Sequence, residues 1–133
     1  MFGSYRKAAG TPIAIILCLF SIVYAYSGGD GTAENPDQIA TISDWQQLMN
    51  TPADWNKNFL QTSDVNLQGV AITPVGNDGD KFTGVFDSNG HKIRNAYMNS
   101  PASDYIGLFG FVGASGQIRN LGAEDVNIIR GNK

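Results

Sequence analysis

A short pattern that recurs in the second half of this 133-residue chain restricts its fold more than any other sequence feature. Gly84-Val85-Phe86 returns as Gly107-Leu108-Phe109, and Ile93-Arg94-Asn95 returns as Ile118-Arg119-Asn120. Both offsets lie in the twenties, a period typical of one turn of a stacked repeat protein, in which equivalent residues of successive turns lie above one another. A β-sandwich, the other architecture that suits many short strands, gives no reason for the same residues to return.

The chain after Lys57 consists of short apolar or alternating runs separated by turn-forming residues. The predicted strands are 59–67, 71–75, 82–86, 92–98, 105–112, 117–121 and 125–129. Together with the repeat, they predict an all-β domain folded as a parallel β-helix of about three rungs.

In such a coil, equivalent residues of neighbouring rungs are expected to lie about 4.8 Å apart inside the core. Each fully buried apolar side chain would contribute about 1.5–3 kcal/mol to stability. The expected stacked pairs are Phe86 with Phe109, Val85 with Leu108, and Ile93 with Ile118. The asparagines that follow, Asn95 and Asn120, are expected to form a ladder of side-chain amides.

The glycines of the repeat are expected at places where a Cβ atom would be costly. Gly90 and Gly116 each precede a strand and are predicted to be corner residues with positive φ. Gly84 and Gly107 suit either a corner or a close approach of neighbouring backbones. Gly110 completes the Gly-Leu-Phe-Gly sequence of the second copy.

The two arginines of the repeat are predicted to point outward on adjacent rungs, where two like charges repel. Glu124, Asp125 or solvent could relieve that repulsion. The alternative is that Arg94 and Arg119 form a shallow anion-binding strip for sulfated or acidic sugars.

The N-terminus has the layout of a secretory signal peptide. Arg6 and Lys7 precede an apolar run, and cleavage is predicted after Ala25. The apolar segment 13–26 is shorter than the roughly 20 residues that a membrane span needs, so an uncleaved anchor is the weaker alternative.

Removal of residues 1–25 would leave a product, 26–133, that contains no cysteine. Its length is enough for one domain, which no disulfide can stabilise. That product carries 7 basic and 12 acidic side chains, a formal charge of −5. Nucleic acid and anionic membrane surfaces are poor partners for so acidic a domain. Contact with a membrane is expected only through the signal peptide or an anchor outside this sequence.

Two short helices are predicted ahead of the strands. Ser43 and Gln46 have the spacing of a capping box, and an apolar face follows at Trp45, Leu48 and Met49. A second helix would begin at Pro52. The chain is thereby divided into a signal peptide (1–25), a flexible lead-in (26–38), a short helical cap (39–58) and β-helix rungs (59–133).

No catalytic arrangement is recognisable. A glycosidase needs two carboxyl groups about 5–9.5 Å apart, but the candidate acids all lie among turn-forming residues. These acids are Asp78, Asp80, Asp87 and Asp104. A calcium ion near Asp78 and Asp80 is the less favoured alternative to a plain turn. His91 is the single histidine, so a His-Glu-x-x-His zinc site is absent and no cofactor is expected.

Gly107-Leu108-Phe109-Gly110, followed by 116–121 and 126–128, resembles the GLUG-motif repeat of bacterial extracellular proteins, including surface adhesins. The resemblance implies a right-handed parallel β-helix, secreted or attached to the cell surface, with one repeat at 105–129. Such proteins usually carry several repeats in series, so the chain is expected to be the N-terminal part of a longer protein. An open final rung would promote self-association, and the isolated domain is expected to be marginally stable or prone to aggregate.

The sequence therefore predicts a non-catalytic extracellular module for adhesion to a cell surface or for binding extracellular glycans or surface proteins. The alternatives are a passive stalk or cap, and a polysaccharide lyase or glycoside hydrolase whose active site lies outside this sequence.

Overall fold

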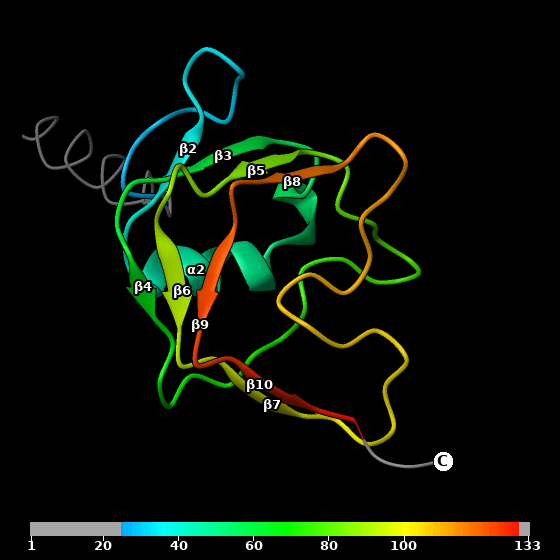
Figure 1. Cartoon of the computed structure of the whole chain (residues 1–133). Helices are drawn as coiled ribbons and strands as arrows, with labels where there is room; N and C mark the ends of the chain where they lie inside the picture. The colour runs from blue at the N-terminus through cyan, green and yellow to red at the C-terminus, as the bar shows by residue number, and fades with distance from the viewer. Residues whose placement is uncertain (1–24, 131–133) are drawn as a thin grey trace, which may run out of the picture.

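The structure, a computed structural model, describes residues 25–130 as a strand-rich domain with one α-helix and three parallel sheets (Figure 1). The four-stranded sheet contains, in order, β2 (Asp37–Ile39), β3 (Asn58–Gln61), β5 (Val85–Asp87) and β8 (Gln117–Arg119). The three-stranded sheet contains β4 (Val65–Asn66), β6 (Lys92–Arg94) and β9 (Gly122–Glu124), and the two-stranded sheet pairs β7 (Tyr97–Asn99) with β10 (Asn127–Ile129). The helices are α2 (Ile42–Asn50) and the 3-10 turn η2 (Pro52–Asp54).

The chain visits the three sheets in rotation. β5, β6 and β7 belong to three different sheets, and β8, β9 and β10 return to the same sheets in the same order. Val85 lies opposite Gln117 and Ile93 lies opposite Ala123. One full rotation of the chain therefore takes more residues than the spacing between the two copies of the sequence motif. Figure 1 shows the four-stranded sheet at the top, the three-stranded sheet at the left and the two-stranded sheet at the bottom.

The predicted stacking register is wrong. Phe86 pairs with Ile118, whereas Ile93 pairs with Val65 on one side and Ala123 on the other. The two Ile-Arg-Asn motifs lie on strands β6 and β8 of different sheets. Each motif ends at an asparagine with positive φ, 57° at Asn95 and 54° at Asn120. The motif therefore marks a strand followed by a corner, and its two copies occupy different positions in successive rotations.

Several predicted strands also differ from the structure. Segments 59–67 and 92–98 each divide into two strands of different sheets, because a corner interrupts each run. Segments 71–75 and 105–112 form no strand and contribute only the isolated bridges Val75 to Phe109 and Phe82 to Val112. β9 was not predicted, since Gly122-Ala123-Glu124 lacks the β-branched and aromatic residues that favour strands.

The glycines of the repeat have two different roles. Gly90 has a φ of 79° and Gly107 a φ of 135°, a region that a side chain disfavours. A Cβ at Gly84 or Gly110 would meet a backbone oxygen at 1.9 or 2.5 Å. Gly116, predicted as a positive-φ corner, is instead required by space, since its Cβ would lie 2.3 Å from the carbonyl oxygen of Phe82.

Helix α2 covers the core through the apolar face that the sequence predicts, because Trp45, Leu48 and Met49 are all buried. The Trp45 ring meets those of Phe86 and Phe109 edge-on, with centroids 5.6 and 5.9 Å apart. Such aromatic pairs add to the stability gained from burial alone.

The predicted helix start at Ser43 is wrong by two positions. The N-cap is Thr41, whose hydroxyl accepts from the amide of Asp44, while the Asp44 carboxylate accepts from the Thr41 amide. A capping box needs a side-chain acceptor three positions after the cap, and aspartate supplies it here in place of the expected glutamine.

The segment 26–38, predicted to be a flexible lead-in, packs against the domain. Tyr26 is buried and its hydroxyl donates to Asp54 at 2.9 Å. The Ser27 amide donates to the Gln38 carbonyl at 3.2 Å, and the Gln38 amide donates to the Gly28 carbonyl at 2.7 Å. The predicted signal peptide lies outside the described residues except for Ala25. Between residues 25 and 130, no helix is long and apolar enough to span a membrane.

The last strand of each sheet has an unpaired edge. β8, β9 and β10 are the outermost strands of their sheets, and Ile128 and Ile129 in β10 are 37% and 41% exposed. Phe109, Ile118 and Val126 are only partly buried where they pack against the core. Apolar side chains and free backbone donors are thus exposed together on this end of the domain.

Candidate binding pocket

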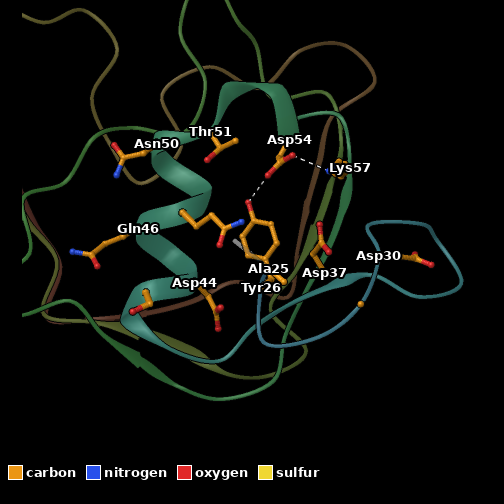
Figure 2. A pocket seen from close by; sticks show the side chains of 13 residues that line it. Ala25, Tyr26, Asp30, Asp37, Asp44, Gln46, Asn50, Thr51, Asp54 and Lys57 are labelled. Carbon is orange, nitrogen blue, oxygen red and sulfur yellow. Dashed lines mark hydrogen bonds and ion pairs between the residues drawn. The ribbon is translucent and has the colours of Figure 1, made fainter. Parts of the chain in front are cut away.

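An open pocket of about 870 Å³ lies where the N-terminal segment passes helix α2 (Figure 2). Its wall is rich in carboxylates, amides and hydroxyls and contains one lysine. The lining residues are Ala25, Tyr26, Gly29, Asp30, Asp37, Ser43, Asp44, Gln46, Gln47, Asn50, Thr51, Asp54 and Lys57.

Asp44 holds the start of the helix through one of its two carboxylate oxygens. One oxygen of its carboxylate accepts from the amides of Ala40 and Thr41 at 2.8 and 3.0 Å, and from the Ser27 hydroxyl at 2.5 Å. A carboxylate at a helix N-terminus also interacts favourably with the helix dipole. Asp44 therefore has a structural role.

Asp54 is engaged as well. It accepts the Tyr26 hydroxyl at one oxygen and binds the Lys57 ammonium at the other, 2.8 Å away. Burial, followed by the hydrogen bond to Asp54, raises the pKa of Tyr26 far above its ordinary value. The hydrogen bond to Asp54 also raises the pKa of Lys57, so this lysine is held in its charged form.

Asp30 closes a surface turn. Its carboxylate accepts from the backbone amide and the hydroxyl of Thr32 at 3.0 and 2.6 Å. The Thr32 hydroxyl bond is the main reason why the pKa of Asp30 is lowered. Figure 2 shows Asp30 on a loop apart from the other acids.

Asp37 differs from the other three acids. It is only 5% exposed, and within residues 25–130 no hydrogen bond to its carboxylate is found. Its carboxylate points toward the space between Tyr26, Asp54 and Lys57 (Figure 2). Burial raises the pKa of Asp37, the negative charges of Asp54 and Asp30 add to this effect, and Lys57 opposes it. Largely burying a carboxylate without a protein donor is costly, and groups with perturbed pKa values cluster at functional sites.

Replacement of Asp37 by Asn is expected to raise the melting temperature by a few degrees at neutral pH. The pKa of Asp37 is higher in the folded than in the unfolded protein, so ionisation of this carboxyl lowers stability. The difference between variant and parent should disappear below the ordinary aspartate pKa, grow as pH rises from there to the folded-state pKa, and stay constant above it. Thermal unfolding between pH 3 and 8 measures this, with Asp78→Asn in an exposed turn as the control of equal charge. A lower melting temperature for Asp37→Asn at pH 7 would contradict the prediction.

The observed register separates the two arginines predicted to form a ligand strip. Arg94 lies opposite Glu124 and forms ion pairs with Glu124 and Asp64, each at 3.1 Å. Arg119 lies opposite Asp87 in another sheet. Glu124 therefore neutralises Arg94, which was one of the alternatives predicted from the sequence. The prediction that the two arginines lie on adjacent rungs is wrong.

The asparagine ladder is also wrong. Asn95 donates to the side chain of Asn66 at 3.0 Å, and Asn120 donates to the carboxylate of Asp87 at 2.9 Å. The two asparagines are at corners that follow different sheets, so they cannot stack on each other. They instead tie each corner to the strand beside it.

The other acids singled out in the sequence lie in turns or form local contacts, and Asp104 pairs with Arg130 at 3.1 Å. Asn77 accepts from the amides of Gly79 and Asp80, which makes 77–80 a side-chain-stabilised turn. Asp87 accepts from the amide of Asn89. His91 is partly exposed, with Nδ1 3.5 Å from Asp64. Over residues 25–130 no group of three His, Cys, Asp or Glu side chains could hold a metal ion.

Sequence reasoning missed the pocket because its wall comes from segments without a common motif. Tyr26 and Asp37 lie in the segment predicted to be a flexible lead-in. They line one pocket only because this segment packs against α2 and η2. The sequence contained one signal, because Asp37 and the buried Ile39 alternate along one strand and therefore share a face.

No family model and no solved structure matches the chain significantly. The chain is 30% identical over 129 residues to a protein of Evansella cellulosilytica described as a Gly-rich membrane protein, covering 84% of this chain and 15% of that one. It is 28% identical over 116 residues to halomucin of Haloquadratum walsbyi, covering 78% of this chain and 1% of halomucin. The chain thus spans only a small part of either relative.

Proposed function

We propose that this chain is a non-catalytic extracellular module of a longer cell-surface protein, built as the N-terminal end of a right-handed parallel β-helix and used in adhesion to extracellular polymers. The observation that carries the proposal is the rotation of the chain through three parallel sheets, with β5, β6 and β7 succeeded by β8, β9 and β10 in the same sheets. Repetition of this unit extends a coil without changing its cross-section.

The two ends of the domain support a place at the start of such a coil. Helix α2 and the N-terminal segment cover the core at β2, whereas β8, β9 and β10 leave edges onto which another rung could pair. Stacked repeat proteins need a terminal unit that shields the core from water. The GLUG resemblance of 105–129 remains part of this proposal.

The names of the two relatives favour the cell surface as the site of action. One is described as a membrane protein and the other as halomucin, and this chain matches a small part of each. A passive stalk is the second candidate, since the unpaired strand edges at 117–129 suit a structural unit.

The test uses the complete chain coupled to beads and exposed to immobilised extracellular polysaccharides. Retention above that of beads carrying an unrelated acidic protein is expected, without release of reducing ends. Antibody against the chain should label intact cells that produce it. Labelling without retention on any polymer would favour the stalk, reducing-end release would favour an enzyme, and no labelling of intact cells would refute a surface role.

A further inference from the structure

The pocket beside α2 contains a free carboxylate whose position suggests a specific class of ligand. We infer that this pocket binds an amino sugar, with the sugar ammonium group on Asp37. The inference rests on the proposed function only in taking the ligand from extracellular polysaccharides, and it assigns a site that the proposed function does not contain.

Asp37 is the one acid of the wall whose carboxylate accepts no hydrogen bond from the described residues. Asp44 is held by two amides and a hydroxyl, Asp54 by Tyr26 and Lys57, and Asp30 by Thr32. Asp37 is buried, with 5% of its surface exposed, and it faces the same space. A ligand that donates hydrogen bonds to this carboxylate would recover the cost of burying it.

The charge of the wall favours a cation. Four aspartates line the pocket together with a single lysine, and that lysine is already bound to Asp54. An ammonium group would both neutralise Asp37 and form charge-assisted hydrogen bonds with it. The absence of any three-acid cluster among residues 25–130 makes a bare metal ion a poor alternative.

The rest of the wall favours a sugar over a simple amine. Ser43, Gln46 and Asn50 contribute a hydroxyl and two amides to the lining. Ala25 is the one aliphatic side chain among the lining residues, so hydroxyl and amide groups supply the contacts that would distinguish a sugar from an alkyl diamine. A volume of about 870 Å³ lies within the range of small-molecule sites and accommodates more than one sugar ring.

Binding of a glucosamine hexamer to the complete chain is to be measured by calorimetry, next to the N-acetylated hexamer and to putrescine. We expect the glucosamine hexamer to bind at least tenfold more tightly than either of the others, because only it joins an ammonium to hydroxyl groups. Asp37→Asn should weaken its binding at least tenfold, whereas Asp78→Asn, with the same change in charge, should bind as the parent does.

Amide chemical shifts of the parent protein provide a second measurement that does not depend on a variant. The glucosamine hexamer should move the resonances of 28–38 and leave those of the turn at 76–80 in place. Equal binding of the acetylated hexamer, equal binding of putrescine, unchanged binding by Asp37→Asn, or shifts outside the pocket would each overturn the inference. Retention on polysaccharides that lack amino groups, with none on glucosamine polymers, would refute this assignment and leave the proposed function intact.

Discussion

Replacement of Phe86 by Ala is expected to lower the free energy of unfolding by about 3–5 kcal/mol, the range found for large aromatic residues in protein cores. The Phe86 side chain is fully buried in β5, where it lies opposite Phe59 in β3 and Ile118 in β8. Its ring also meets those of Trp45 and Phe109 at 5.6 and 5.3 Å. Because Phe86 joins three neighbouring strands to the covering helix, the cavity cannot close by movement of one side chain.

Urea unfolding followed by tryptophan fluorescence measures this loss, since Trp45 and Trp55 are both buried. Small domains unfold with about 5–15 kcal/mol in total, so the variant should retain little stability. Tyr97→Ala is the control, because Tyr97 is 52% exposed in β7 and should cost less than about 1 kcal/mol. A loss for Phe86→Ala no larger than that of the control would mean that this ring does not hold the sheets together.

The sequence predicted the strand-rich class and the buried face of α2, but it did not predict the register. Identical letters at 93–95 and 118–120 suggested that the two motifs stack, whereas the strands that hold them belong to different sheets. The backbone explains the error: an asparagine with positive φ ends a strand equally well at any corner, and Asn95 and Asn120 both do so. Local sequence therefore reports the corner, while pairing partners distant in the sequence decide the register.

The pocket was beyond sequence reasoning for a different reason. Asp37 lies in β2, which pairs with β3, and the nearby Lys57 ammonium forms its ion pair with Asp54. Neither fact has a local signature. By contrast, the burial of Trp45 follows from helical periodicity alone, and that prediction is confirmed.

Replacement of Gly84 by Ala is expected to destabilise the domain more than the same change at Gly69 or Gly79. A Cβ at Gly84 would lie 1.9 Å from the carbonyl oxygen of Lys57, and this oxygen belongs to the backbone. The Lys57 oxygen also accepts from Val85 at 3.1 Å, at the start of the pairing between β3 and β5. Relief of the clash would therefore break hydrogen bonds in the centre of the four-stranded sheet.

The two other glycines separate this steric effect from conformational strain. Gly69 has a φ of 78° and open space around it, so Gly69→Ala should cost only the strain of a left-handed residue, about 1–2 kcal/mol. Gly79 lacks positive φ and would meet only the Asn77 side chain at 3.4 Å, so Gly79→Ala should be close to neutral. Urea unfolding followed by far-ultraviolet circular dichroism should show the largest loss of stability for Gly84→Ala, a smaller loss for Gly69→Ala and the smallest for Gly79→Ala. The close approach of the backbones before β3 and β5 is the source of the strain expected at Gly84. A loss for Gly84→Ala no larger than that for Gly69→Ala would therefore mean that these backbones lie farther apart in solution.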